Sequence, residues 1–114
     1  MTHSLADDYR GHPFLPEREE LDAMPRLYAT ESVKADDKIV VLHFFTGVCD
    51  WWIVEVGEDH RIAFGYACLG DEAGAEWGYV DLVELRTLFV QYPGMMPVYV
   101  ERDLHWSPRP FRDI

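Results

Sequence analysis

A chain of 114 residues, 48% hydrophobic and 14% aromatic, suits one domain with its own core and is too short for two. Its 21 acidic and 10 basic residues give a net charge of −11, which disfavours direct binding to a nucleic-acid backbone. It has no apolar run of about 18 residues, and its first residues show neither a basic region nor an apolar signal core, so a cytoplasmic protein without a membrane span is expected.

The N-terminal segment is mostly polar. Residues 1–16 include Gly11, Pro13 and Pro16 and predict a flexible arm, followed by a single domain over residues 17–114. A short helix is expected over residues 16–24, because proline is tolerated at the first helical position and acidic residues suit a helix N-terminus. The next residue is again a proline, which ends this helix.

The middle of the chain has the pattern of strands. Residues 39–46 are an unbroken apolar run, typical of a central strand covered on both faces, and His43 within it is expected to be a core histidine rather than a ligand. A second strand over residues 51–56 alternates, so that Trp52 and Glu55 take opposite faces. A turn leads into a third strand at residues 62–68, whose small residues on one face admit a helix.

The second half of the chain predicts a strand, a helix and a last strand. Residues 76–80 form the fourth strand, and Asp81 with Glu84 is the aspartate form of a capping box. The following helix carries an apolar stripe of Leu82, Leu85, Leu88, Phe89 and Tyr92. Pro93 and Gly94 end it, and a final strand runs from residue 98 to 105 or 106.

This order of elements defines the expected fold. Hairpin-length connections make the first strands antiparallel, so the class is α+β, with one mostly antiparallel sheet of four to five strands and two helices packed on it. Cys49 and Cys68 fall in different strands of a chain that does not look secreted. Both are therefore expected to be free, mostly buried thiols.

Motifs for catalysis and metal binding do not occur in the sequence. None of the five histidines pairs at metal-ligand spacing, and the chain has no C-x-x-C pair, P-loop, G-x-G-x-x-G or G-x-S-x-G motif. The sequence therefore predicts no catalytic residue, no metal and no cofactor, and it favours a protein that is not an enzyme.

Strand alternation places Arg102 on the apolar side of the last strand, with Glu101 and Asp103 on the opposite, solvent-facing side. A buried guanidinium needs a carboxylate partner because its desolvation is costly. The candidate partners are Glu31, Glu55 and Glu84. In this interpretation Arg102 is a structural ion-pair anchor.

A polar stretch after the first helix offers Arg102 a different role. Tyr28, Thr30 and Glu31 supply a phenol, a hydroxyl and a carboxylate within four residues. In one interpretation they connect two elements and satisfy backbone donors. In the other they form a pocket with Trp52 and Arg102, which binds a small ligand or carries out catalysis, with the guanidinium holding a carboxylate or phosphate.

Negative charge is concentrated in the middle of the chain. Residues 50–86 contain nine acidic and two basic residues, a net charge of −7. Such a segment either contributes to solubility or forms an acidic face that meets a basic protein surface. The predicted acidic face comprises Asp50, Glu58, Asp59, Asp71, Glu72 and Glu76.

An ordered series of segments resembles a known family. The segments include LYATE at residues 27–31, HFFT at 43–46, GYVDLVEL at 78–85, VERDL at 100–104 and PRP at 108–110. Together they resemble a family of small acidic bacterial proteins that plasmids, phages and other mobile elements carry, and for which no activity is established. The resemblance covers about residues 24–111 and departs at residues 47–50, where relatives carry a proline-containing turn.

The resemblance implies a setting in which small proteins interfere with host defence or regulate plasmid maintenance. With the charge pattern, it favours a binding protein that engages a basic host protein, such as a nucleic-acid-binding component of restriction or CRISPR defence, without binding nucleic acid or membrane itself. The small-ligand pocket around Arg102 is the alternative, and self-association through Trp51 or Trp77 is a third hypothesis. The sequence leaves the oligomeric state open.

Overall fold

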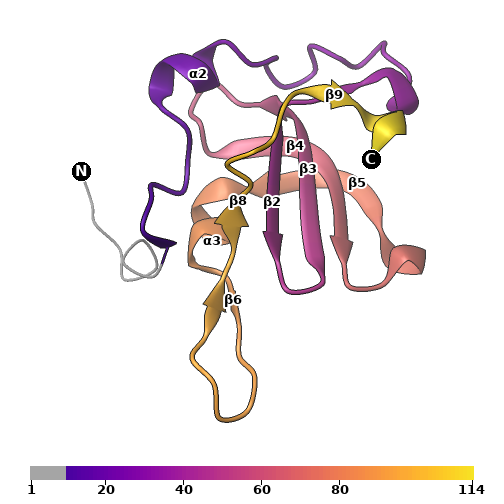
Figure 1. Cartoon of the computed structure of the whole chain (residues 1–114). Helices are drawn as coiled ribbons and strands as arrows, with labels where there is room; N and C mark the ends of the chain where they lie inside the picture. Colours follow the sequence, from indigo (N-terminus) through magenta and orange to yellow (C-terminus); the bar gives the residue numbers. More distant parts are fainter. Residues whose placement is uncertain (1–9) are drawn as a thin grey trace.

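A five-stranded antiparallel sheet forms the centre of the computed structural model, which describes residues 10–114 (Figure 1). Its strands, in spatial order, are β5 (Glu76–Asp81), β4 (Ile62–Leu69), β3 (Cys49–Val56), β2 (Leu42–Thr46) and β8 (Glu101–Arg102). Two short pairs lie beside it, β1 (Ile39–Val40) with β9 (Arg109–Pro110) and β6 (Phe89–Val90) with β7 (Val98–Tyr99). Helices α2 (Arg18–Asp22) and α3 (Leu82–Thr87) and the short 3-10 helices η1 (Ala35–Asp37), η2 (Glu72–Gly74) and η3 (Phe111–Asp113) complete the domain. The predicted α+β class is confirmed.

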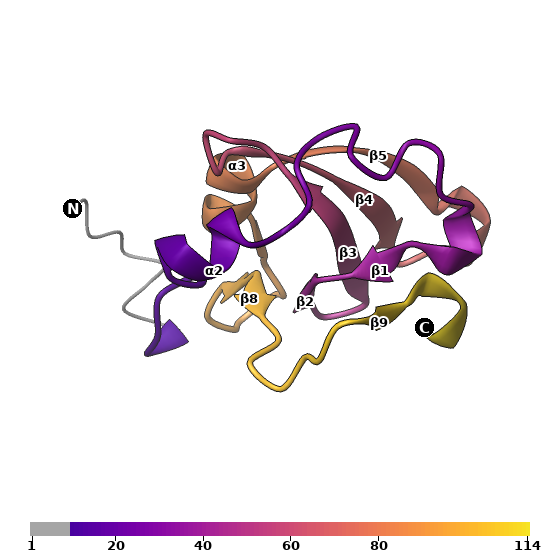
Figure 2. The ribbon, with the colours of Figure 1, turned by 90° about the horizontal axis from the view of Figure 1, so that it is seen from above.

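One face of the sheet and the two helices enclose the apolar core. Phe44 of β2 and Ile53 of β3 are fully buried there, together with Leu21 of α2 and Leu85 of α3. Ala63 of β4 belongs to the same core, as the small face of the third predicted strand indicated. Figure 2 shows α2 and α3 at one side of the molecule and the β1–β9 pair at the other. No helix within residues 10–114 has the length and apolar character to cross a membrane.

The apolar run over residues 39–46 is two strands rather than one. The chain breaks at Val41, so that β1 leaves the main sheet to pair with β9, while β2 lies between β3 and β8. Along β2, buried and half-buried residues alternate, which is the pattern of a strand with one well-covered face. β2 is an inner strand, but the prediction of one strand over residues 39–46 that is covered on both faces is wrong, because only one face of β2 is fully buried.

Residues 10–16 pack on the core, which corrects the flexible arm expected over residues 1–16. Phe14 is only 2% exposed and stacks on Phe44, with ring centroids 4.8 Å apart. The Arg10 guanidinium lies over the Phe14 ring, and its Nε donates a 2.7 Å hydrogen bond to the Val100 carbonyl. The buried Phe14 ring thus fixes the position of residues 10–16 on the core. The remainder of the expected arm, residues 1–9, lies outside the described residues.

Strand β3 contains a bulge that changes which of its residues share a face. The register with β4 shifts between Ile53 and Glu55, which makes Val54 an extra residue. Beyond the bulge, Glu55 lies on the same face as Trp52, whereas strict alternation predicted opposite faces.

Helix α3 begins where it was predicted and ends earlier. The Asp81 carboxylate caps it, because Oδ1 accepts hydrogen bonds from the backbone N–H groups of Val83 (2.9 Å) and Glu84 (3.2 Å). The helix stops at Thr87 and does not continue to Tyr92. The predicted apolar stripe is therefore wrong in its second half.

The residues after α3 form a hairpin that projects from the domain (Figure 1). Its two strands are β6 and β7, and the Val100 N–H then donates a 3.1 Å hydrogen bond to the Leu88 carbonyl. Only Glu101–Arg102 continues into the main sheet, as β8. The single final strand predicted from residue 98 is thus divided at Val100.

Cys49 and Cys68 are free thiols, as predicted. Cys68 is buried and Cys49 is half-buried. Burial is the main cause that raises the pKa of the Cys49 thiol, and the Asp50 carboxylate adds to it. A thiol with a raised pKa is a poor nucleophile near neutral pH.

Gly65 and Gly78 lie opposite each other on β4 and β5 but differ in the space around them. A Cβ atom at Gly65 would lie 2.2 Å from the Trp52 carbonyl oxygen, whereas one at Gly78 would meet no atom within 4 Å. We expect Gly65→Ala to lower the free energy of unfolding by about 2–3 kcal/mol, because β3 and β4 must move apart. Gly78→Ala should change it by less than about 0.5 kcal/mol. Urea unfolding measures both, and equal losses would contradict this difference in packing.

Candidate functional site

The face of the sheet opposite the core carries a row of rings from four adjacent strands. The register places His43 of β2 opposite Trp52 of β3. Trp52 lies opposite Tyr66 of β4, which in turn lies opposite Trp77 of β5. Neighbouring ring centroids along this aromatic row are 5.5, 6.1 and 5.4 Å apart. Ring contacts at such distances stabilise the sheet beyond the area that they bury.

The C-terminal segment covers part of the aromatic row. The Phe111 ring of η3 lies 4.9 Å from the Tyr66 ring and 4.8 Å from the Trp77 ring. The Trp106 indole N–H donates a 2.9 Å hydrogen bond to the Val40 carbonyl, which fastens this segment to β1. Hollows lie toward both ends of this face.

His43 of the aromatic row is held by two carboxylates. Its Nε2 lies 2.8 Å from Asp50 Oδ1, and its Nδ1 lies 3.0 Å from Asp103 Oδ2. When the ring carries a proton on each nitrogen, it donates a hydrogen bond in both contacts. The ring also stacks on Trp52 with an interplanar angle of 6°. His43 is hydrogen-bonded as predicted, but it lies half-buried on the face opposite the core, so the predicted core position is wrong. Asp103 is its partner rather than a solvent-facing carboxylate.

The first hollow, which we name the Asp50 hollow, lies beside the β2–β3 turn and the β4–β5 connection. It measures about 540 Å³, and the rings of Trp52 and Tyr66 form part of its lining. Two carboxylates, those of Asp50 and Glu72, also line it. Among the described residues, no lysine, arginine or histidine is in the lining. The hollow therefore combines aromatic surface with negative charge.

A further carboxylate lies beside the Asp50 hollow. Asp71 adjoins the lining residues Gly70 and Glu72 in the chain. Glu76 is at the same end of the sheet, but it pairs with Ala67 of the core, so its side chain leaves β5 on the opposite face. His43 contacts Oδ1 of Asp50, whereas Oδ2 has no hydrogen-bond partner within residues 10–114. A carboxylate oxygen in this state is a ready acceptor for a cationic ligand.

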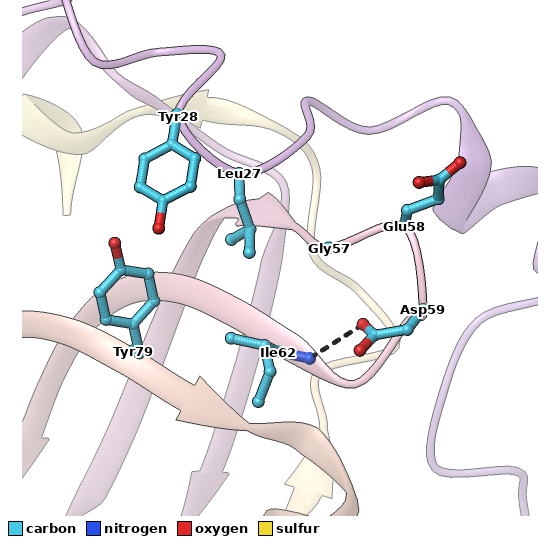
Figure 3. Close-up of a pocket in the computed structure, with 7 residues that line it drawn as sticks. All are labelled: Leu27, Tyr28, Gly57, Glu58, Asp59, Ile62 and Tyr79. Atoms are coloured by element: carbon cyan, nitrogen blue, oxygen red, sulfur yellow. Dashed lines mark hydrogen bonds between the residues drawn. The ribbon is translucent and has the colours of Figure 1, made fainter.

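The second hollow, the Tyr28 hollow, lies at the other end of the same face, beside the β3–β4 turn (Figure 3). It measures about 680 Å³ and is lined by Leu27, Tyr28, Gly57, Glu58, Asp59, Ile62 and Tyr79. The hydroxyls of Tyr28 and Tyr79 point toward each other, with ring centroids 6.4 Å apart (Figure 3). Glu58 and Asp59 are the remaining two predicted acids.

Asp59 is held in its ionised form by the turn in which it lies. Its Oδ1 accepts hydrogen bonds from the backbone N–H groups of Arg61 (2.9 Å) and Ile62 (3.3 Å). These bonds, the one from Arg61 first, lower the pKa of Asp59 below its usual 3.8. The Tyr28 hollow therefore keeps this negative charge down to acidic pH.

Buried Glu55 holds the segment that carries Tyr28. Glu55 is 3% exposed and accepts hydrogen bonds from the backbone N–H groups of Tyr28 (2.8 Å) and Thr30 (2.9 Å), and from the Thr30 hydroxyl. The Lys38 ammonium donates a 3.0 Å hydrogen bond to the same hydroxyl. Tyr28 has a φ of 71°, which is uncommon for a residue other than glycine. The Glu55 carboxylate stabilises this conformation.

Three of the five residues predicted to form a pocket lie together. Tyr28 and Glu31 line a small hollow of about 280 Å³ with Glu55, and Thr30 is bound to the Glu55 carboxylate. Trp52 lies farther along the same face and lines the Asp50 hollow. The side chains of this polar stretch were predicted to accept hydrogen bonds from backbone donors. Instead, the backbone N–H groups of Tyr28 and Thr30 donate to the buried Glu55 carboxylate.

Arg102 is not part of that group. It lies opposite Phe44 in the pairing of β8 with β2, which places it on the core side of the sheet. Its Nη2 donates a 3.4 Å hydrogen bond to the Pro13 carbonyl, and it forms no ion pair with the described residues. The predicted ion pair is not formed among the described residues, because Glu55 takes the other face and binds Tyr28 and Thr30. Arg102 lines a different hollow, of about 650 Å³ beside Pro13 and Phe14, and not one with Tyr28 and Glu31.

Tyr79, Leu27 and Ile62 were not predicted as site residues. Alternation alone does not show that Ile62 and Tyr79 share a face. That conclusion also requires the register between β4 and β5. The connection between these strands, residues 70–75, is too long for a turn type that sets the register. Sequence alone therefore carried no signal for this half of the Tyr28 hollow.

The tryptophans considered for self-association are not free surface contacts. Trp51 is 5% exposed and belongs to the core. Trp77 is half-buried and contacts Phe111. Packing within the domain thus accounts for both rings.

Comparisons with known proteins add no assignment to this geometry. No protein-family model matches the chain, and no match is found among curated proteins or solved structures.

Replacing the Glu55 carboxylate should disturb the segment around Tyr28. In Glu55→Gln, an NH2 group takes the place of one acceptor oxygen and faces backbone donors. We expect a loss of about 2–4 kcal/mol in the free energy of unfolding, since hydrogen bonds to a charged acceptor contribute about 1.5–3 kcal/mol each. Glu31→Gln, at an exposed site, is the control and should change stability by less than about 0.5 kcal/mol. Urea unfolding and amide exchange at Tyr28 give the measurement, and equal effects of the two variants would contradict the role of Glu55.

The contact between His43 and Asp103 predicts a pH dependence of stability. Burial acts to raise the pKa of Asp103, but hydrogen bonds from His43 and from the His105 backbone N–H (3.0 Å) lower it below its usual 3.8. Because the folded-state pKa lies below the unfolded one, the charged carboxylate stabilises the fold above the unfolded pKa. That stabilisation is lost as the pH falls through the folded-state pKa.

We therefore expect Asp103→Asn to be less stable than the wild type near pH 6, and this deficit to shrink toward about pH 3 as the wild-type carboxylate is protonated. Urea unfolding at the two pH values measures the change. Asp36→Asn, at an exposed aspartate of η1, is the control and should show no such trend. A deficit of the same size at both pH values would argue against a role for the charge.

Proposed function

We propose that this chain is a non-enzymatic binding protein that engages a basic partner at the Asp50 hollow. The proposal rests on one combination: aromatic rings and carboxylates line the same hollow, and no basic side chain of the described residues is in its lining. A lysine ammonium or an arginine guanidinium placed there meets ring faces and carboxylate oxygens together. Cation–π contacts of this kind contribute about 0.5–2 kcal/mol, and charge-assisted hydrogen bonds add to them.

The charge of the whole chain supports the same partner class. A net charge of −11 produces a negative potential that attracts a basic surface and raises the rate of association. Asp71 and Glu72 concentrate that potential at the Asp50 hollow. Such attraction is screened over about 8 Å at physiological salt, so binding should weaken as salt rises.

The arrangement of the acids favours capture of single basic side chains over imitation of a nucleic-acid backbone. Glu58 and Asp59 lie in the β3–β4 turn, at the opposite end of β4 from Asp71 and Glu72. The eight residues of β4 span roughly 26 Å. Phe111 covers rings between the two ends, so the six acids make two groups rather than one even array of charges.

The resemblance to acidic proteins of mobile elements supports a more specific partner. Host proteins that handle nucleic acids, such as components of restriction or CRISPR defence, present clustered lysine and arginine side chains for phosphate contact. These side chains have the chemistry that suits the Asp50 hollow. We therefore propose that the partner is a cytoplasmic host protein of this kind and that binding inhibits it.

Charge reversal beside the Asp50 hollow tests the proposal. Glu72 lines the hollow, is exposed and makes no side-chain hydrogen bond among the described residues, so Glu72→Lys changes charge at the hollow without removing a structural contact. We expect this variant to bind its basic partner at least tenfold more weakly, which corresponds to about 1.4 kcal/mol. The measurement is retention of proteins from a bacterial extract at low and moderate salt, followed by titration of the protein that is retained.

The matched control reverses one charge elsewhere. Glu19→Lys, at an exposed site of α2, should leave the affinity within about twofold. Asp50→Asn tests the hollow itself and should weaken binding as well. Equal losses in Glu72→Lys and Glu19→Lys would show that only overall charge matters, and no loss in either would place the contact elsewhere.

A further inference from the structure

We propose that the Tyr28 hollow is a separate binding site for an alkylammonium group, carried on a lysine side chain of a partner protein. The hollow shares no lining residue with the Asp50 hollow and lies at the other end of the sheet. A lysine side chain has an apolar stem and a charged head, and the hollow offers a different surface to each.

Apolar side chains line the part of the hollow that would contact the alkyl stem of the lysine. Leu27 and Ile62 are both half-buried, so each presents part of its side chain to the hollow. In Figure 3 they lie between the tyrosine pair and the β3–β4 turn. An alkyl chain laid along this wall buries its methylene groups against two aliphatic side chains.

Tyrosine rings and a phenol oxygen are available to the ammonium group of the lysine. Tyr28 and Tyr79 are 62% and 58% exposed, so a ligand can reach both rings. A hydrogen bond with the Tyr28 hydroxyl, followed by desolvation and by the charges of Glu55 and Glu31, raises the pKa of Tyr79. The Tyr79 phenol therefore stays protonated at neutral pH, and its oxygen and ring face can both contact an ammonium group.

Basic side chains near the hollow are engaged elsewhere. Arg61 donates to Asp81 through Nε (3.0 Å) and Nη2 (2.9 Å). Lys38, which lines the adjoining small hollow, donates to the Thr30 hydroxyl. Glu58, in contrast, is exposed and forms no ion pair within residues 10–114. The local charge of the Tyr28 hollow is therefore negative.

The backbone at Tyr28 is preorganised for ligand binding. Three hydrogen bonds to Glu55 fix the backbone at Tyr28 and Thr30, and Tyr28 keeps its left-handed conformation in consequence. Exposed side chains on a backbone fixed in this way lose less conformational entropy on binding than those on a loose loop. The strained backbone lies at the site, where strain often accompanies ligand contact.

This inference deepens the proposed function and rests on it in one respect, because the same basic partner would supply the lysine. The hollow itself is tested separately with a small probe. n-Butylammonium chloride is titrated into the full chain, with the ring signals of Tyr28 and Tyr79 followed by NMR and the Trp52 indole signal as reporter of the Asp50 hollow. We expect saturable shifts of both tyrosines at millimolar concentrations and at least fivefold weaker binding of 1-butanol.

Two further comparisons test the source and the site. An acetyl-Gly-Lys-Gly-amide peptide should bind at least as tightly as n-butylammonium, and a tenfold preference for the free amine would overturn the assignment to lysine. Tyr79→Leu should weaken n-butylammonium binding at least threefold. Tyr92→Leu, which removes the same group at an exposed site outside the hollow, should not.

The outcomes separate the two proposals. Tyrosine signals that do not move, or that move equally with 1-butanol or in Tyr79→Leu, would overturn the site at the Tyr28 hollow. Asp50→Asn should leave the tyrosine titration unchanged, and loss of that titration in Asp50→Asn would also count against two separate sites. Failure of the Asp50 hollow appears in the Trp52 signal and in the charge-reversal experiment alone.

Discussion

The extra residue in β3, Val54, sets the direction of the Glu55 carboxylate, and the functional face depends on that direction. A buried carboxylate without partners costs several kcal/mol, so Glu55 must be matched by donors wherever it points. On the outer face the donors are the Tyr28 and Thr30 backbone N–H groups. The segment between α2 and η1 is therefore anchored to the sheet at this point. One wall of the Tyr28 hollow exists because of that anchor.

His43 has a corresponding role at the other end of the face. Its two nitrogens contact Asp50 from the neighbouring strand and Asp103 from the segment after β8. A histidine between two carboxylates joins these segments and orients Asp50, whose second oxygen then remains available at the hollow. Each hollow thus contains side chains whose position is set by a polar contact, while the aromatic row and Phe111 keep the region between them rigid.

The sequence was most informative where local chemistry decides structure. The Asp81 cap and the small face of β4 depend on residues close in the chain, and both were predicted correctly. The bulge at Val54 is a property of the pairing between two strands, and neither strand contains a residue that requires it. The same holds for Phe14, because its burial depends on a Phe44 ring that lies 30 residues away.

The end of α3 shows a different limit. An apolar stripe at helical spacing continues through Phe89, yet Phe89 pairs with Tyr99 across the projecting hairpin. Apolar residues in a short segment fit both the helical and the strand period. Pairing with a strand ten residues away makes this segment a strand rather than a helix. Arg102 is the related case in the site. Alternation gave its face correctly, but the bulge turns Glu55, one of its three candidate partners, to the opposite face.

The two hollows constrain a partner more strongly together than either does alone. The rigid sheet holds them apart by roughly the length of β4, about 26 Å, and loop motion cannot shorten that separation. A partner with one exposed lysine gains a single weak contact. A partner with basic side chains at the matching distance gains a second contact at high effective concentration, which raises the overall affinity far more than one contact does. Since lysine and arginine occur on most protein surfaces, this spacing rather than the chemistry of either hollow would provide specificity.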